Sequence, residues 1–423
     1  PLSPALVIAG AGSGKTETMA NRVVWLVANG LVPITEVLGM TFTRKAAGEL
    51  AERIRLRLAM LRESGLLTID SSEIDQATVT TYNSFAHRMY SQYAVFIGRD
   101  PDATILGEAA AWQLARKIAR EETGETLVDM DKSLDILTEA ILRVAHQIAD
   151  NVADPSQVIS YANTLSEQIA VLPLDEGTRK KVSPESFGKI IEVAKTLPTL
   201  VELATKFSEA KRLSGAIEFS DQVALALDIC EKFPNVIADY QSQFSVILLD
   251  EYQDTSVVQA QLLARLFAHQ PVMAVGDPHQ SIYGWRGASA DNIEEFGRTF
   301  GSGPEATYSL STSWRNSHAV LAAANALVEP LVAHSSIAVQ QLSASTRASE
   351  GHVDSFYSET ILDEADHVGR WFAEKMTPKT SAAMLCRSVK SLEPFKKALD
   401  RHNVAYHVVG VGGLLDEPVV VDL

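Results

Sequence analysis

The chain has 423 residues, of which 46% are hydrophobic and 21% charged, and this composition is typical of a globular protein with two to four domains of roughly 150 residues each. The formal net charge of −16 argues against a protein that binds nucleic acid over its whole surface, but an acidic protein can still carry a local basic groove. No run of about 18 apolar residues occurs, so no membrane span is predicted. Cys230 and Cys386 have no metal or redox spacing and are interpreted as free, buried thiols.

Residues 5–10 form a short apolar run that predicts a strand, and a glycine-rich turn follows it. This run starts only four residues after the first residue, and no initiator Met or signal-peptide pattern precedes it, so we expect a portion of a longer protein. Apolar residues at three- and four-residue spacing then predict a helix that stops near Gly30, and residues 37–42 predict a second strand. Residues 44–63 predict another helix, and residues 77–81 a third strand. Four arginines on the flank of this second helix are interpreted as a solvated face: Arg53, Arg55, Arg57 and Arg62.

The stretch from residue 95 to residue 215 is rich in Ala, Leu, Glu and Lys, and its mostly helical pattern predicts an inserted all-helical domain. Strand–helix alternation resumes with apolar runs at 244–250 and 272–277, which predicts an α/β fold with a parallel sheet covered by helices. From residue 308 a further α/β unit is predicted. Its strands are predicted near residues 352–357 and 381–387.

The motif AGAGSGKT lies between the first strand and the first helix, which is the context that a P-loop requires. Glycines without Cβ let the backbone wrap closely around phosphate oxygens, and the helix adds its positive N-terminus. We expect Lys15 to reach the β- and γ-phosphates of ATP and the Thr16 hydroxyl to ligate Mg²⁺. The alternative is a glycine-rich turn that binds nothing, and the combination of strand, GKT and helix argues against it. The candidate nucleotide-binding residues are Ala9, where the strict pattern has Gly, and Gly10, Ala11, Gly12, Ser13, Gly14, Lys15 and Thr16.

Two adjacent acids, Asp250 and Glu251, follow four apolar residues at 246–249. A P-loop Mg²⁺ needs a second anchor at the end of a neighbouring strand, and Asp250 fits that role. Glu251 is placed to polarise the attacking water as a general base. Most isolated acid pairs are solvated surface groups, but a buried-looking strand in front of this pair favours the catalytic interpretation.

Five stretches in this order resemble the motifs of UvrD/Rep-type superfamily 1 DNA helicases: AGAGSGKT (9–16), TFTRKAA (41–47), DEYQDT (250–255), VGDPHQSIYGWRGA (275–288) and SWRN (313–316). Residues 217–227 and 382–410 are also similar to that family, so the resemblance covers nearly the whole chain outside the helical insertion. The residues around the first two motifs resemble the sequences of the actinobacterial branch, which includes the helicase–nuclease AdnAB.

The resemblance implies a P-loop NTPase with RecA-like parallel sheets that carry helices on both faces, plus the inserted all-helical domain. It implies a first RecA-like domain at residues 1–94 and 216–307, the helical insertion at 95–215, and a partial second RecA-like domain at 308–423. In the family a further inserted domain and two last motifs follow, and the chain stops where that insertion would begin. We therefore expect these residues alone to bind nucleotide but not to unwind DNA efficiently.

For the ATP site, the resemblance implies that Gln280 senses the γ-phosphate and that Arg315 acts as an arginine finger on the transferring phosphoryl group. Together with Lys15 and Glu251 these are the candidate catalytic residues. Trp314 stands where the family usually has a Tyr that stacks on adenine, and an indole can keep that role.

For the DNA site, stacking of aromatic rings on bases ignores sequence, which suits a motor that must pass any base. Tyr283 and Trp285 are the strongest stacking candidates, and for Phe42 core packing is an equal alternative. The candidate DNA-contacting residues are Thr41, Phe42, Thr43, Asn83, Tyr283, Trp285 and Arg286.

Two departures from the family pattern stand out. Glu17 follows GKT where the family usually has an Arg that covers adenine, which puts a two-sided adenine clamp in doubt. Asn83 stands where the family often has His, so a donor remains but the imidazolium charge does not. The family's upstream glutamine motif is absent from the sequence.

The resemblance thus implies an ATP- and Mg²⁺-dependent DNA helicase of the cytoplasm and nucleoid, with 3′→5′ polarity taken from the family and with single-stranded DNA and single-strand/duplex junctions as partners. A second helicase–nuclease subunit is left open. One alternative is a degenerate motor subunit that serves as a DNA-binding scaffold in such a heterodimer, and Glu17 and Asn83 are its best support. Another is an unrelated P-loop NTPase such as a small-molecule kinase, which does not explain QSIYGWRG (280–287).

Overall fold

The computed structural model divides into two compact units, Pro1–Gly351 and His352–Leu423. It describes residues 2–65, 76–122, 133–170, 184–284, 287–289, 291–301, 303, 306–332, 337–388 and 391–409. Trp285 and Arg286, two of the candidate DNA-contacting residues, lie outside the described residues.

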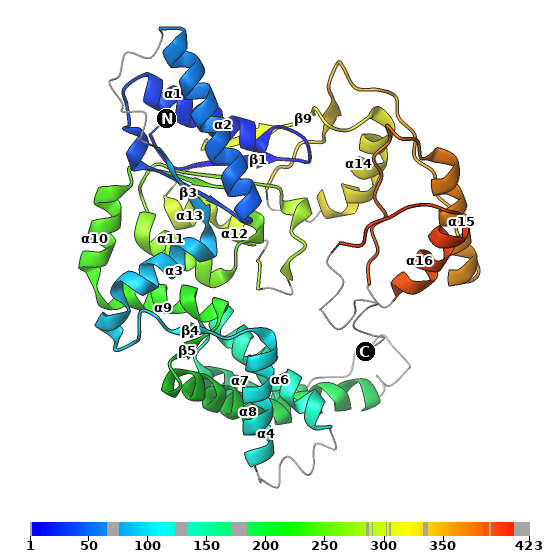
Figure 1. Ribbon diagram of the computed structural model, residues 1–423. Coiled ribbons are helices and arrows are strands. Elements are labelled where there is room, and N and C mark those ends of the chain that lie inside the picture. The colour runs from blue at the N-terminus through cyan, green and yellow to red at the C-terminus, as the bar shows by residue number, and fades with distance from the viewer. Residues whose placement is uncertain are drawn as a thin grey trace. The chain divides into compact units, whose positions relative to one another are not determined.

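A six-stranded parallel sheet forms the centre of the first unit (Figure 1), with the strand order β3-β2-β6-β7-β1-β8. Its strands are β1 (Ala5–Ala9), β2 (Val37–Thr41), β3 (Thr78–Thr81), β6 (Val246–Leu249), β7 (Val272–Gly276) and β8 (Thr307–Leu310). Every residue of the four inner strands β2, β6, β7 and β1 is buried, which explains why these strands appear in the sequence as continuous apolar runs.

Helices cover both faces of this sheet, as the sequence predicts. Alternate residues of β1 divide between two buried clusters: Leu6 and Ile8 pack with α3, α9 and α11, whereas Val7 and Ala9 pack with α1 and α2. The covering helices are α1 (Lys15–Ala28), α2 (Arg44–Glu63), α3 (Tyr82–Tyr93), α9 (Phe219–Lys232), α10 (Pro234–Gln243), α11 (Val257–Phe267), α12 (Asp291–Glu294) and α13 (Phe296–Phe300). The prediction of a parallel α/β fold is confirmed.

The predicted helical insertion is present between α3 and α9. It consists of α4 (Glu108–Glu121), α6 (Leu134–Asp150), α7 (Pro155–Ala170) and α8 (Pro184–Leu213). Ala115, Ile141 and Phe207, from three different helices, are fully buried in a separate core. A short parallel ribbon of β4 (Thr104–Ile105) and β5 (Ala216–Ile217) closes the base of the insertion.

The chain after β8 forms β9 (Thr312–Ser313), α14 (His318–Val332) and β10 (Ser343–Ala344), all within the first unit. Because β8 pairs with β1, residues 308–310 belong to the first sheet. The division into three domains at residues 94, 215 and 307 stays a prediction.

In the second unit, α15 (Ile361–Lys375) packs on α16 (Leu392–Arg401) through Ala365, Phe395 and Ala398.

The prediction of strands at 352–357 and 381–387 is wrong. Both segments are described and neither is a strand, and Tyr357 is 97% and Leu385 94% exposed. A strand is stabilised by hydrogen bonds to a neighbouring strand, and the described residues of this unit supply no such neighbour. The expectation that Cys386 is buried fails for the same reason, since it lies in the exposed second segment, whereas Cys230 is buried as predicted.

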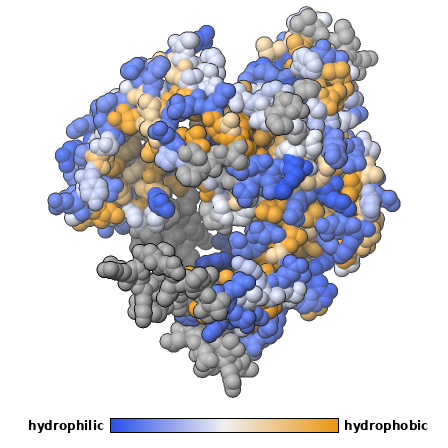
Figure 2. All heavy atoms as spheres, turned by 180° about the vertical axis from the view of Figure 1, so that it is seen from behind, coloured by the Kyte–Doolittle hydropathy of each residue, from blue (hydrophilic) through white to orange (hydrophobic). Residues whose placement is uncertain are grey.

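Hydrophilic residues cover much of the face shown in Figure 2, with apolar residues between them. Among the described residues no helix combines the length and the apolar character needed to cross a bilayer.

Candidate nucleotide- and DNA-binding site

The phosphate loop runs from the end of β1 to the start of α1. Gly12 and Gly14 have φ angles of +75° and +93°, in the left-handed region that residues with a Cβ rarely adopt. The Ser13 hydroxyl donates to the Gly10 carbonyl oxygen at 2.8 Å and fixes the turn. Helix α1 begins at Lys15, so its free first-turn N–H groups face the loop and favour an anion there.

The acid pair lies at the carboxyl end of β6, two strands away from β1 in the same sheet. The Asp250 N–H donates to the Met40 carbonyl oxygen at 2.9 Å, and the Tyr82 hydroxyl donates to the Asp250 carbonyl oxygen at 2.8 Å. Burial, reinforced by the neighbouring Glu251 charge, raises the pKa of the Asp250 carboxyl to about 6. A carboxylate destabilised in this way is a site where a cation would be favourable.

Glu251 adopts φ +48°, a conformation that costs a non-glycine residue about 1–2 kcal/mol. Lys15 Nζ donates to Glu251 Oε2 at 2.6 Å across 236 residues of sequence. The phosphate loop and the acid pair therefore meet at one place, as the two motifs require.

The donor set fits Mg²⁺ bound together with a nucleotide. Within the described part of the chain no group of three or more His, Cys, Asp and Glu side chains could hold a metal ion. Mg²⁺ commonly takes one or two protein oxygens and completes its shell with phosphates and water. The Asp250 carboxylate and the Thr16 hydroxyl, which follows Lys15 in α1, are oxygens of this kind.

Gln253, which sequence reasoning missed, connects the acid pair to the end of β7. It lies in the turn η3 (Tyr252–Asp254) and is 1% exposed. Its Nε2 donates to Glu251 Oε2 at 2.8 Å, and its Oε1 accepts from the Asp277 N–H at 3.0 Å. Gly276 makes room for this contact, because a Cβ there would lie 2.7 Å from Gln253 Oε1.

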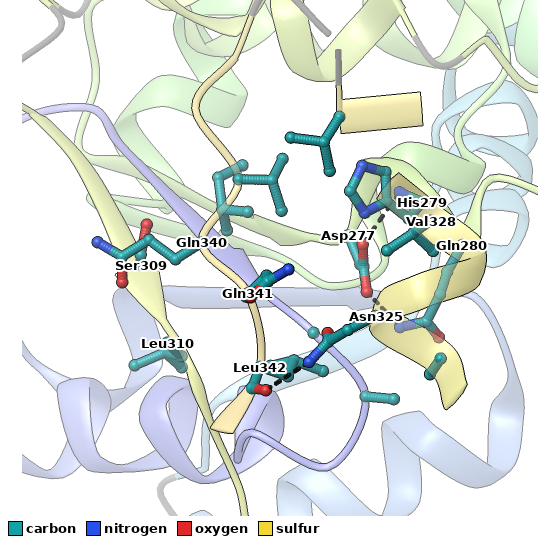
Figure 3. A pocket seen from close by; sticks show the side chains of 16 residues that line it. Asp277, His279, Gln280, Ser309, Leu310, Asn325, Val328, Gln340, Gln341 and Leu342 are labelled. Carbon is teal, nitrogen blue, oxygen red and sulfur yellow. Dashed lines mark hydrogen bonds between the residues drawn. The ribbon is translucent and has the colours of Figure 1, made fainter. Parts of the chain in front are cut away.

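Asp277, also missed, orients the predicted γ-phosphate sensor. In the turn η4 (Pro278–Gln280), Gln280 Nε2 donates to Asp277 Oδ2 at 2.5 Å and the His279 N–H donates to Asp277 Oδ1 at 3.0 Å (Figure 3). Lys15 is thereby linked to Gln280 through three intervening residues, Glu251, Gln253 and Asp277. Both missed residues lie inside matched motifs and shortly after a buried strand ends, at Leu249 or at Gly276. That position was the available signal.

A cavity of about 160 Å³ lies beside the start of the phosphate loop. Figure 3 shows Asp277 and Gln280 on one side of the cavity. Asn325 also lines it, and its Nδ2 donates to the Leu342 carbonyl oxygen at 2.9 Å. Leu342 packs on Gly10, where a Cβ would come within 2.6 Å of its side chain. The cavity reaches Gln280 but is lined by neither Lys15 nor the acid pair.

The SWRN segment lies directly on the phosphate loop. The Trp314 N–H donates to the Gly12 carbonyl oxygen at 2.8 Å, and the Ser313 hydroxyl donates to the Ala11 carbonyl oxygen at 3.0 Å. A Cβ on Gly12 would lie 2.6 Å from the Cβ of Arg315. The Trp314 side chain is 66% exposed, so its ring face is open for stacking.

Two of the candidate DNA-contacting residues meet although they come from distant motifs. The rings of Phe42 and Tyr283 stack with centroids 5.0 Å apart and planes inclined by 26°. Thr43 is exposed and caps α2 by accepting from the Ala46 N–H at 3.1 Å. Thr41 is fully buried, and its hydroxyl donates to the Thr43 carbonyl oxygen at 3.0 Å.

Asn83 is exposed at the start of α3, and its Oδ1 accepts from Gln259 Nε2 at 2.9 Å. The amide of Asn83 is thus oriented by α11, with its own Nδ2 donors left to other partners.

Glu17 does not stand alone. It accepts from Arg53 Nη1 at 3.2 Å and from Arg57 Nη2, both on α2. The interpretation of the α2 arginines as a solvated face is incomplete for these two, because they are 41% and 38% exposed and also pair with an acid on a neighbouring helix. Arg55, in contrast, is 53% exposed and pairs with Glu52 of its own helix.

The sheet, the phosphate loop and the acid pair define an α/β P-loop protein. The family model for the UvrD/REP helicase N-terminal domain matches residues 1–301. The chain belongs to this family.

Relatives cover almost the whole chain. It is 26% identical to ATP-dependent DNA helicase PcrA of Leuconostoc citreum over 426 residues, which is 99% of this chain and 50% of the relative. It is 27% identical to DNA helicase II of Haemophilus influenzae over 415 residues (97% and 50%), and 26% identical to ATP-dependent DNA helicase UvrD2 of Mycobacterium tuberculosis over 432 residues (98% and 54%). The chain spans about half the length of these curated relatives. The narrower resemblance to AdnAB stays a prediction.

Proposed function

We propose that this chain is the front portion of an ATP-driven DNA helicase that moves 3′→5′ along single-stranded DNA. The observation that carries the proposal is the 2.6 Å contact between Lys15 and Glu251, which joins the phosphate loop and the acid pair in one site. The names of the relatives, all ATP-dependent DNA helicases or DNA helicase II, support it.

In the proposed mechanism, the α1 N-terminus and Lys15 bind the β- and γ-phosphates of ATP. Asp250 and Thr16 would hold Mg²⁺, which neutralises charge on those phosphates. The Lys15 amine can bind either Glu251 or a phosphate oxygen, so transfer of Lys15 to phosphate leaves the Glu251 carboxylate able to accept a proton from water. Arg315 and Trp314 lie in the segment that packs against the phosphate loop. Arg315 would contact the transferring phosphoryl group, and Trp314 would contact the adenine.

The link to DNA would run through the segment that carries both Gln280 and Tyr283. Gln280 is connected to the acid pair by hydrogen bonds through Asp277 and Gln253. Tyr283, three residues after Gln280, stacks on Phe42. A ring pair of this kind offers a stacking surface that is indifferent to base identity. Trp285 and Arg286 remain proposed DNA contacts, as do single-strand/duplex junctions as substrates and a cytoplasmic, nucleoid-associated location.

The scaffold alternative draws on two departures from the family pattern, Glu17 beside the phosphate loop and Asn83 at the start of α3. We favour the active motor because Lys15, Asp250, Glu251 and Gln280 are all kept and linked. A scaffold subunit would bind DNA without hydrolysing ATP, so one assay separates the two.

The test is ATP hydrolysis by the full-length protein with and without single-stranded DNA, beside Lys15→Ala and the control Lys232→Ala. Lys232 is a 59% exposed lysine on α9 that pairs with Asp228. We expect DNA-stimulated hydrolysis that Lys15→Ala abolishes and Lys232→Ala preserves. Equal hydrolysis by wild type and Lys15→Ala would overturn the proposal.

Unwinding assays test the polarity, because a 3′→5′ motor should prefer a duplex with a 3′ tail over one with a 5′ tail. Efficient unwinding by residues 1–423 alone would contradict our expectation that these residues do not unwind DNA efficiently.

A further inference from the structure

Helices α1 and α2 lie side by side (Figure 1), and a polar cluster joins them near the phosphate loop. Glu17 accepts from Arg53 Nη1 at 3.2 Å and from Arg57 Nη2. Arg57 Nη1 also donates to Asn21 Oδ1 at 2.7 Å. Glu17 and Asn21 are one turn apart on α1, and Arg53 and Arg57 are one turn apart on α2, so two facing stripes meet.

The cluster lies next to the residues that would hold the triphosphate. Glu17 follows Thr16 in the first turn of α1, and a Cβ added to Gly14 would lie 3.8 Å from the Glu17 Cβ. An acid in this turn stabilises the helix itself, but it opposes the binding of a second anion at the same helix end. Glu17 therefore needs neutralising if the loop is to take a nucleotide.

The two guanidinium groups of Arg53 and Arg57 carry two positive charges and the Glu17 carboxylate one negative charge, so the cluster as a whole is cationic. Its three charged side chains are 38–41% exposed. Ion pairs as open to solvent as these contribute little to folding stability. Compensation of the Glu17 charge is thus a better account of the cluster than attachment of α2 to α1.

We propose that Arg57, with Arg53, is a positioning residue for nucleotide binding: it holds the Glu17 carboxylate away from the phosphate loop and keeps the rim of the loop cationic. The inference rests on the proposed function, because it assumes that the loop binds ATP. It gives α2 a role in nucleotide affinity. The same helix begins two residues after Phe42 of the aromatic pair.

The experiment is a double-mutant cycle in the full-length protein with Glu17→Gln, Arg57→Ala and the double variant. The affinity for Mg²⁺ with a slowly hydrolysed ATP analogue, ATPγS, is measured by calorimetry, and KM and kcat for ATP are measured beside it. Arg55→Ala is the matched control, since it removes an arginine two residues away that pairs within its own helix.

Arg57→Ala should weaken binding about fivefold and raise KM with little change in kcat, because the cluster does not touch the reacting atoms. Glu17→Gln should tighten binding, and in its presence Arg57→Ala should cost less than about twofold. The effect should fade at about 1 M salt, where the screening length is about 3 Å.

Unchanged affinity in Arg57→Ala, or the same loss with and without Glu17, would overturn the inference. A loss of affinity in Arg55→Ala as large as that in Arg57→Ala would also do so. If the wild-type protein itself binds no ATPγS, the proposed function fails instead, so the two failures are distinguishable.

Discussion

The nucleotide site and the aromatic pair hold their side chains in different ways. At the nucleotide site, Lys15, Glu251 and Gln253 are joined by contacts of 2.6 and 2.8 Å, and Gln253 is almost fully buried. At the aromatic pair, Phe42 and Tyr283 are half-buried and meet through ring faces 5.0 Å apart. Chemistry on a phosphate needs atoms fixed by directional hydrogen bonds, whereas contact with any base needs an open ring surface. The comparison predicts large losses from small changes at the first region and modest losses from large changes at the second.

The largest effect is expected for Glu251→Gln, which keeps the size of the side chain and removes its basicity. ATP turnover should fall by about 10²–10⁴-fold, the usual contribution of a general base. ATP binding should persist, because Lys15 and the α1 N-terminus remain. Hydrolysis and ATPγS affinity are to be measured on the same preparations, and turnover within tenfold of wild type would remove Glu251 from the catalytic role.

The next effect concerns the contact between the phosphate loop and SWRN. Gly12→Ala places a Cβ 2.6 Å from Arg315 Cβ and 2.9 Å from Ser313 Oγ, at φ +75°. Strain and displacement together should cost about 2–4 kcal/mol and should weaken ATP binding.

Gly30→Ala is the matched control for Gly12→Ala, since it has φ +66° with nothing within 4 Å. It should cost only about 1 kcal/mol and leave ATP affinity intact. Denaturant unfolding and ATPγS binding measure both variants, and equal effects would show that the contact with SWRN is unimportant.

A third, smaller effect concerns the burial of Asp250. Its pKa of about 6 lies above the ordinary 3.8, so the folded protein binds more protons than the unfolded chain between about pH 4 and pH 6. This group therefore lowers the free energy of unfolding as the pH rises through that window. Asp250→Asn should raise the stability of the protein without nucleotide by on the order of 2 kcal/mol at pH 7.5, and by little below about pH 4.

Thermal unfolding at both pH values, beside the surface variant Asp228→Asn, measures the Asp250 effect. An Asp250→Asn protein that is no more stable at pH 7.5 would contradict the burial account. The same variant should lose the extra stabilisation that Mg²⁺ and ATP give the wild type.

The smallest effect is expected at the aromatic pair. Phe42→Ala or Tyr283→Ala should weaken binding of oligo(dT) by about 1 kcal/mol, near the lower end for loss of one stacking ring, because each ring shares its surface with the other. ATPγS affinity without DNA should not change. Tyr161→Ala is the control, since Tyr161 is a 65% exposed aromatic residue on α7. An equal loss in the control would mean that the pair has no special role.

The parts that sequence predicts well are those whose signal is local. The Gly-rich turn and the strand directly before Asp250 each carry their pattern within ten residues, and both are present as predicted. The connection between Gln253 and Asp277 depends on one hydrogen bond across 24 residues of chain, which no local pattern encodes. The pairing of Arg57 with Glu17 is missed for the same reason, because helix periodicity does not identify the neighbouring helix.

The strands predicted at 352–357 and 381–387 show the opposite error. A short run that contains apolar residues is compatible with a strand, but it does not supply the neighbouring strand that a ladder requires. The described residues of the second unit contain no strand that could pair with either segment.

The central claim is that Lys15 and Glu251 act in one site, and a double-mutant cycle on ATP hydrolysis tests it most directly. Lys15→Met, Glu251→Gln and the double variant are compared in the full-length protein with saturating single-stranded DNA. Residues that act as a unit give strongly non-additive losses, so the double variant should be about as slow as the worse single variant. If the losses multiply instead, the two residues act independently and the single-site account is contradicted.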